Sequence, residues 1–324
     1  MKRASALIAA LVLVASAEVA GGAEPRTIGI VAMGPQSVFR ELPTYARFYA
    51  RMRELGWREG ENIRYVGRGV AGDATKLDQA MQEHLRNGVA IIVTVGWQEA
   101  LAAKRATSTL PIVMVHPNDP VEIGLVTSLN RPGGNITGSY TPALHAKRAE
   151  ILAELVPGTK RLLLAYDPPA PSAKIVARLA EVTQRYRHTS TWTELPANGE
   201  YDAWAAKAKR DGIDSVLIPA GASTFRPARR QALAEALVKH RLPAMCGSGD
   251  YVESGCLASY SALNLEFFSG AAEYVDKILR GAKPGDLAIR QPSVFEFVVN
   301  LKTAKALGIS IPQSILMRAD RVIE

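Results

Sequence analysis

Residue types that commonly carry out chemistry are sparse in this 324-residue sequence, and their spacing suits neither catalysis nor metal binding. Cys246 and Cys256 fit neither a CxxC redox pair nor a zinc site. In an oxidising compartment they could be bridged, and the alternative is two separate reduced thiols in the core; the sequence leaves both open. The histidines are far apart and show no ligand spacing: His84, His116, His145, His188 and His240. No catalytic residue, metal ion or cofactor is predicted.

The individual histidines have mostly structural interpretations. His84, His188 and His240 fall in or at the ends of expected helices, which predicts surface or helix-end positions. His116 ends an expected strand and could touch a ligand, although isolated histidines are usually structural. The sequence also lacks the phosphate-loop, zinc-protease, nucleophile-elbow and dinucleotide-binding motifs. These absences argue against an enzyme.

A different set of residues suits the binding of a small molecule. Its members come directly after an expected strand or at a crossover, where helix N-termini offer backbone N–H groups to anions. They are Pro35, Gln36, Ser37, Trp97, Gln98, Asn118, Asp119, Tyr140, Asp167, Ser223, Thr224, Gly247, Ser248 and Tyr260. Trp97 offers a flat face to an apolar body or a cation, or it packs beneath its loop. For the polar residues the alternative is turn building or helix capping.

These residues are placed by an alternation of short apolar runs with amphipathic segments, which predicts parallel sheets covered by helices. Strands are expected at residues 27–33, 62–66, 89–95 and 111–115, and again at 161–166, 189–194, 215–218, 244–246 and 294–299. Helices are expected at residues 42–55, 77–85, 100–106, 172–186, 201–210, 227–240, 265–279 and 302–307. The turn-rich residues 131–135 interrupt the series and are interpreted as a crossover.

The fold class predicted is therefore α/β, with two doubly wound parallel-sheet lobes joined by a hinge. Lobe one is assigned residues 24–138 plus about 264–290, and lobe two residues 139–263 plus about 291–324. Ligands of open α/β sheets bind outside the carboxyl ends of the strands. The candidate residues of the two lobes should therefore meet in a cleft between them.

The first 23 residues have the pattern of a secretory signal peptide. Lys2 and Arg3 precede an apolar run at residues 7–14, and small residues follow at 15–17 and 21–23. The run is shorter than the roughly 20 residues that span a bilayer, which disfavours a membrane anchor. No cysteine stands at the cleavage site for lipid attachment. We expect a mature chain that begins near Glu24 and is free in the periplasm.

Composition and charge are those of a globular protein with 48% hydrophobic and 22% charged residues. The formal net charge of +8 comes from basic residues scattered over expected helix surfaces, as at Arg47, Arg51 and Arg53. They form no aromatic-interleaved patch, so a nucleic-acid partner is not predicted.

Several segments together resemble the ABC transporter substrate-binding family that includes the tryptophan/tyrosine-type binding proteins. They are Leu55-Gly56-Trp57, Asp119-Pro120-Val121, residues 128–138, Arg241-Leu242-Pro243, and residues 272–284, 300–308 and 318–324. The resemblance implies a type I periplasmic-binding-protein fold, a hinged cleft and delivery of a ligand to a membrane permease. It also implies that Asp119 could accept an ammonium or hydroxyl group. A monomer is expected.

Two segments depart from the family pattern and bear on ligand choice. Residues 96–100 carry Trp97 and Gln98 where the family has Gly-Thr-Pro-Ala, and residues 219–224 replace a Leu-Pro-Asp-type turn. The expected ligand is a small organic molecule with an anionic or polar end and an apolar or aromatic body, such as an amino acid or an aromatic carboxylate. An exported ligand sensor and a hydrolase on the same scaffold are the alternative functions.

Overall fold

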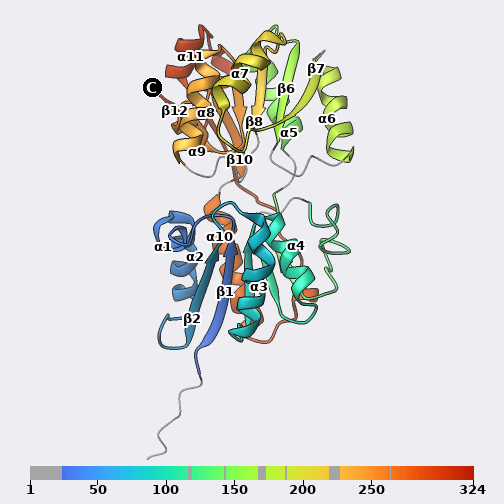
Figure 1. Ribbon diagram of the computed structural model, residues 1–324, viewed down its shortest axis with the longest axis vertical. Coiled ribbons are helices and arrows are strands. Elements are labelled where there is room, and N and C mark those ends of the chain that lie inside the picture. Colours follow the sequence, from blue (N-terminus) through green and yellow to red (C-terminus); the bar gives the residue numbers. More distant parts are fainter. Residues whose placement is uncertain are drawn as a thin grey trace, which may run out of the picture.

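A computed structural model describes residues 24–115, 119–141, 144–166, 173–186, 188–218, 227–262 and 264–324. The chain forms two lobes, each built on one sheet with helices packed on both faces (Figure 1). The predicted fold class is confirmed, and most strand pairs are parallel. No helix in the described ranges combines the length and the apolar character needed to cross a membrane.

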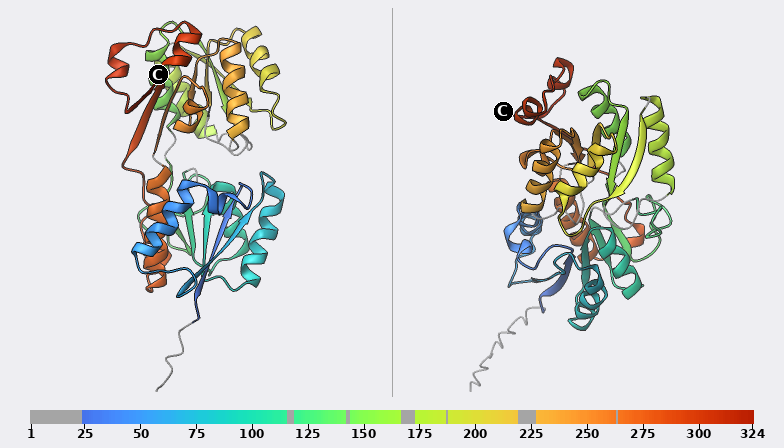
Figure 2. Two further views of the ribbon diagram at one scale, coloured as in Figure 1. Left: turned by 90° about the vertical axis from the view of Figure 1, so that its left-hand side faces the viewer. Right: turned by 45° about the horizontal axis from the view of Figure 1, so that its top comes forward.

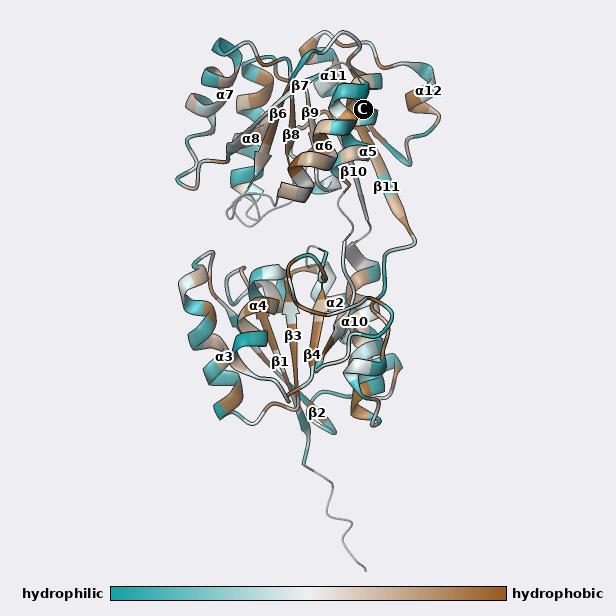
Figure 3. Ribbon diagram, turned by 90° about the vertical axis from the view of Figure 1, so that its right-hand side faces the viewer, coloured by the Kyte–Doolittle hydropathy of each residue, from teal (hydrophilic) through white to brown (hydrophobic). Residues whose placement is uncertain are grey.

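The sheet of lobe one has the strand order β2-β1-β3-β4-β5, and all its pairs are parallel. Its strands are β1 (Arg26–Ala32), β2 (Ile63–Gly69), β3 (Ile91–Val95), β4 (Ile112–Val115) and β5 (Ile136–Gly138). Its helices are α1 (Val38–Glu41), α2 (Pro43–Glu54), α3 (Leu77–Arg86), α4 (Trp97–Ala106) and α10 (Asn264–Leu279), with 3-10 turns η1 (Ala74–Lys76) and η3 (Pro284–Asp286). Strands β1, β3 and β4 are apolar along most of their length because helices cover both faces (Figure 3).

The sheet of lobe two has the order β12-β11-β10-β9-β8-β6-β7, and only the β10–β11 pair is antiparallel. Its strands are β6 (Arg161–Tyr166), β7 (Thr189–Glu194), β8 (Ser215–Ile218), β9 (Ala244–Cys246), β10 (Ala258–Ala262), β11 (Phe295–Asn300) and β12 (Arg321–Ile323). Its helices are α5 (His145–Leu155), α6 (Ala173–Arg185), α7 (Tyr201–Arg210), α8 (Pro227–Lys239), α9 (Gly249–Glu253), α11 (Leu301–Leu307) and α12 (Gln313–Leu316).

Helix α10 follows β10 of lobe two but packs in lobe one, beside α2 (Figure 2). Its Phe267 and Phe268 are buried in the same core cluster as Phe48 of α2. The Trp57 indole Nε1 donates to Asp276 Oδ1 at 2.8 Å, which fixes the end of α2 to α10. The Leu55-Gly56-Trp57 segment of the family resemblance therefore serves packing within lobe one.

Two of the connections between the lobes are hydrogen-bonded to each other in a short parallel ladder. Arg290 N donates to Gly138 O at 2.9 Å, and Tyr140 N donates to Arg290 O at 3.1 Å, with Ser139 paired to Arg290 between them. Gly138 has φ +133°, and a Cβ there would lie 2.2 Å from Met114 O. We call Gly138, Ser139, Tyr140 and Arg290 the crossover ladder.

The structure corrects two sequence interpretations. Residues 131–135 are not a crossover between lobes, because they connect β4 to β5 within one sheet and Gly133 N donates to Gly285 O at 3.1 Å. His188 is buried, and His84 lies in the last turn of α3, as expected, but is fully buried and not at the surface. Its ring lies so close to β1 that a Cβ at Gly29 would be 2.9 Å from Nδ1, and burial lowers the pKa of His84 to about 4. The residue boundaries of the two lobes stay a prediction.

Candidate functional site

The carboxyl ends of both sheets lie on the side where the chain passes between the lobes. Strand β5 leads directly into the crossover ladder, and it is parallel to β4, β3 and β1. Strand β10 leads into α10, and it is parallel to β9, β8 and β6. The two carboxyl edges therefore face each other between the lobes (Figures 1 and 3).

The described candidate residues follow this geometry. At the edge of lobe one, neighbouring strands β1, β3 and β4 are followed by Pro35, Gln36, Ser37, Trp97, Gln98 and Asp119. At the edge of lobe two, neighbouring strands carry Gly247, Ser248 and Tyr260, and Tyr140 lies in the crossover ladder. Asn118, Asp167, Ser223, Thr224 and His116 lie outside the described residues. Their role as ligand-binding residues stays a prediction.

The loop after β1 is held on β2 by the Gln36 amide. Gln36 Nε2 donates to Gly67 O at 2.9 Å, and Gly69 N donates to Gln36 Oε1 at 3.0 Å, so both ends of the amide are used by backbone. A Cβ at Gly69 would lie 2.4 Å from Gly34 O, which explains the glycine. Gln36 therefore shapes the loop, while Ser37 is exposed beside it and Pro35 is half-buried.

The first turn of helix α4 contains a buried carboxyl group, that of Glu99. Glu99 is 1% exposed, and its Oε1 accepts a hydrogen bond from Met33 N at 2.8 Å. Burial raises the pKa of Glu99 to about 8. Trp97 and Gln98 are half-buried on the same first turn. Because Glu99 occupies this N-terminus, α4 is a poorer place for a ligand carboxylate than its sequence indicates.

Asp119 serves the turn that follows it. Its Oδ1 accepts hydrogen bonds from Val121 N at 3.0 Å and from Glu122 N at 3.2 Å. This is the capping role expected of an aspartate at the start of a turn. One carboxylate oxygen of Asp119 is thus hydrogen-bonded to the backbone, and this fixes the segment after β4.

Tyr140 connects the lobes. Its ring is buried in a core cluster of lobe one, and its hydroxyl oxygen accepts a hydrogen bond from Gln291 Nε2. Gln291 follows Arg290 of the crossover ladder, so the phenol tightens the pairing of the two connections. Tyr140, which was predicted to contact the ligand, thus joins the two connections between the lobes in the structure.

At the edge of lobe two, a residue that the sequence analysis missed lies among the predicted ones. Arg148 of α5 donates from Nε to Tyr260 O at 2.8 Å and from Nη2 to Gly247 O at 3.2 Å. The Tyr260 ring stacks on Phe295 with centroids 5.7 Å apart, and Ser248 precedes α9. The available signal was an arginine within the apolar stripe of a helix, since Arg148 precedes buried Ile151 by one turn.

The two cysteines are free and buried in the core of lobe two. Burial, followed by a hydrogen bond that the Cys246 thiol makes to the Cys256 side chain, raises the pKa of the Cys246 thiol well above its usual value. The thiols are therefore adjacent and unbridged in the structure. A raised pKa lowers thiolate content, so reactivity is not favoured. Within the described ranges, no three His, Cys, Asp or Glu side chains gather as a metal site.

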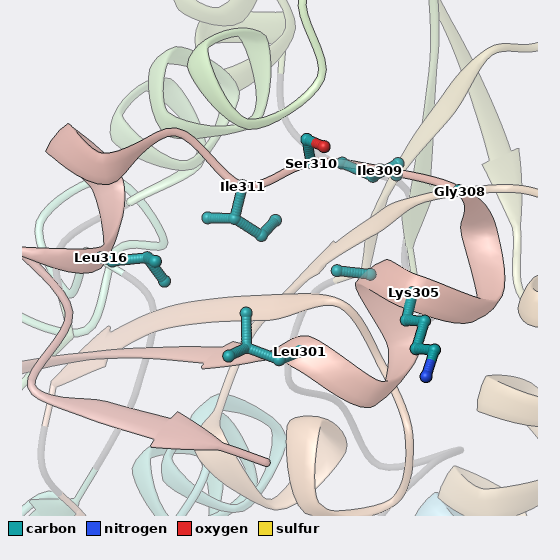
Figure 4. Close-up of a pocket in the computed structure, with 8 residues that line it drawn as sticks. Leu301, Lys305, Gly308, Ile309, Ser310, Ile311 and Leu316 are labelled. Atoms are coloured by element: carbon teal, nitrogen blue, oxygen red, sulfur yellow. The ribbon is translucent and has the colours of Figure 1, made fainter.

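A groove of about 440 Å³ lies between α11 and α12 (Figure 4). It is lined by Leu301, Ala304, Lys305, Gly308, Ile309, Ser310, Ile311 and Leu316. Strand β11 runs antiparallel to β10, so Leu301 at its end lies at the opposite edge of the sheet from Tyr260 and Gly247. The groove is therefore separate from the candidate site.

Comparison with known proteins agrees with this architecture. A tyrosine-binding protein of Clostridioides difficile is 24% identical over 263 residues, which cover 81% of this chain and 75% of that protein. A conserved domain protein from Vibrio cholerae has a similar structure, with a TM-score of 0.84, 22% identity, and coverage of 92% of this chain and 100% of that one. An ABC domain from Streptococcus pneumoniae in complex with L-Trp has a TM-score of 0.81, 22% identity and the same coverage.

These structural likenesses show the shared fold. The model of a single family, described as ABC transporter substrate binding protein, matches residues 44–323. That match includes the crossover ladder, α10 and every strand of the two sheets except β1. The chain therefore belongs to the ABC transporter substrate-binding protein family.

Proposed function

We propose that this protein captures a small organic ligand, an amino acid or an aromatic carboxylate, in a cleft between its lobes. The observation that carries the proposal is the placement of the two carboxyl edges, which face each other beside the crossovers in a chain of a ligand-binding family. Residues from both edges would then contact one ligand, and closure of the lobes would remove it from water.

The relatives and the aromatic residues at the edges support this ligand class. One relative is a tyrosine-binding protein, and one structural neighbour holds L-Trp. Here Trp97 is half-buried at the start of α4, and Tyr260 is half-buried in β10. Aromatic side chains on opposing lobes suit an aromatic ligand body through stacking or edge-to-face contact.

The proposal includes export and a membrane partner. The basic, apolar and small-residue pattern of residues 1–23 supports secretion to the periplasm with a mature chain from Glu24. Membership of the family supports delivery of the ligand to an ABC permease. The protein would act as a monomer and without a cofactor.

A thermal-shift screen of L-tyrosine, L-tryptophan, benzoate, phenylacetate and short aliphatic acids tests the ligand class. A ligand that binds only the folded state stabilises it by about 2.7 kcal/mol at a hundredfold excess over its dissociation constant. Trp97→Ala should weaken binding of the best hit at least tenfold, since a buried aromatic contact is lost. Trp192→Ala, in the edge strand β7, is the matched control and should leave affinity unchanged.

Two outcomes would contradict parts of the proposal. If only metal ions or large oligosaccharides raise the melting temperature, the ligand class is wrong. If an acid binds but Trp97→Ala binds it as the wild type does, the class stands and the placement of the site in lobe one is wrong.

A further inference from the structure

Arg148 is a buried cation at the carboxyl edge of lobe two. It lies in the first turn of α5 and is 6% exposed. The same helix buries Ile151, Leu152 and Leu155, so the arginine occupies a position where a helix normally carries an apolar side chain. Charged side chains are rarely buried to this degree unless they are paired.

The contacts of its guanidinium leave hydrogen-bonding capacity. A guanidinium has five N–H donors. Among the described residues its hydrogen bonds use Nε and Nη2, and both acceptors are backbone carbonyls, those of Tyr260 and Gly247. These carbonyls lie one residue beyond Cys246 and Ser259, the last pair of the β9–β10 ladder. The guanidinium therefore sits where two central strands separate at the carboxyl edge.

The described residues supply no carboxylate to balance this charge. Burial lowers the pKa of Arg148 to about 10, while Cys246 and Tyr251 act in the opposite direction, so the side chain stays charged at neutral pH. Its neighbour His145 is neutral there, because burial and then Arg148 lower its pKa to about 4. Two other arginines of this lobe are paired: Arg321 contacts Glu253 at 2.6 Å, and Arg318 contacts Glu154.

A buried charge without a counter-charge is costly, and a bound anion would remove that cost. The first turn of α4, at the carboxyl edge of lobe one, already holds the Glu99 carboxyl group, which accepts a hydrogen bond from the backbone of Glu99 itself. We propose that Arg148 is the anion-binding residue of the site and that it takes the carboxylate of the ligand. A guanidinium binds a carboxylate through two parallel hydrogen bonds, which a neutral amide cannot match. This inference rests on the proposed function and narrows its ligand to carboxylates.

The test compares matched acid and amide ligands. Isothermal titration calorimetry would measure L-tryptophan against L-tryptophanamide and phenylacetate against phenylacetamide, with wild type, Arg148→Gln and Arg148→Lys. The wild type should prefer each acid at least tenfold. Arg148→Gln should lose most of that preference while its amide affinity changes by less than threefold, and Arg148→Lys should be intermediate because it keeps the charge without the fork. Arg161→Gln, exposed at the amino end of β6, is the control and should keep the preference.

Each outcome decides between the two proposals. If Arg148→Gln weakens acid and amide equally, Arg148 only supports Tyr260 and Gly247, and the inference is wrong while the proposed function stands. If the wild type binds the amides as well as the acids, the inference is again wrong. If the wild type binds no member of either pair nor any other acid in the thermal screen, the proposed function itself fails.

A second measurement does not depend on the stability of a variant. A crystal structure of the wild-type protein with L-tryptophan should place the ligand carboxylate about 3 Å from the Nη atoms of Arg148. A carboxylate found on the α4 N-terminus, with Arg148 contacting only protein, would overturn the inference.

Discussion

At the scale of single residues, Glu99 gives the fold an unusual pH dependence. It is almost fully buried, and its pKa of about 8 exceeds that of an exposed glutamate. The folded state therefore binds a proton that the unfolded state has released, and stability falls as pH rises from about 4.5 to about 8. We expect the free energy of unfolding to drop by roughly 2 kcal/mol between about pH 6.5 and pH 9. Urea denaturation followed by circular dichroism would measure it.

Glu99→Gln isolates this effect, because the amide keeps an acceptor for Met33 N but does not ionise. Its stability should be nearly level over the same interval. His84 and His145 act in the opposite direction but only below about pH 6.5, since their pKa values are lowered to about 4. An unchanged slope in Glu99→Gln would show that another group titrates.

The cysteine pair supports the core and not binding. Replacing both Cys246 and Cys256 with serine should destabilise the protein by about 1–3 kcal/mol, because hydroxyl groups are placed among apolar neighbours. Ligand affinity should stay within a few fold. Thermal melts and calorimetry on the double variant give both numbers, and complete loss of binding would contradict an accessory role.

The sequence was sufficient to place the described candidate residues at the carboxyl edges of the sheets but not to show which contacts each one makes. Their positions follow from strand ends, which apolar runs reveal. Their hydrogen-bond partners come from distant segments of the chain. The Gln36 amide bonds to the backbone of Gly67 and Gly69, and the Glu99 carboxyl group accepts from Met33 N. For Arg148 the apolar stripe of α5 could have indicated burial, but its acceptors, more than ninety residues away along the chain, are backbone atoms that carry no sequence signal.

At the scale of elements, the β5 connection depends on a glycine at its end. Gly138→Ala should destabilise the protein by roughly 2–4 kcal/mol, because φ is +133° and the new Cβ would meet Met114 O. Gly134→Ala is the matched control: nothing lies within 4 Å of its Cβ position. It should change stability by less than about 1 kcal/mol. Denaturant melts compare the two, and equal effects would contradict the steric argument.

Most strands and helices were predicted, including the three-residue β9, whereas β5, β12 and the eleven-residue α5 were missed. Strands such as β1 and helices such as α7 have enough periodic residues to stand out. Strands β5 and β12 have three residues each, and their pairing partners rather than their composition make them strands. Helix α5 was missed because Arg148 interrupts its apolar stripe. The wrong interpretation of residues 131–135 follows from the missed strand β5. Because β5 was not recognised, the crossover was expected before this strand and not after it.

At the scale of the whole molecule, the proposed export leads to a prediction about the mature chain. Intact mass spectrometry of the protein secreted by a bacterial host should give a chain that begins near Glu24 and carries no lipid. A chain that retains Met1 would contradict cleavage. An added acyl mass would contradict the absence of a lipid anchor.

The return of α10 to lobe one has a consequence for the order of assembly. Phe267, Phe268 and Val275 complete a core that otherwise consists of residues made far earlier, such as Ile28 and Phe48. During synthesis from the N-terminus, lobe one therefore lacks part of its interior until α10 has emerged, and lobe two awaits β11 and β12 later still. Neither lobe can therefore complete its interior until the segments from α10 to β12 have been made, so the last part of the chain finishes both lobes.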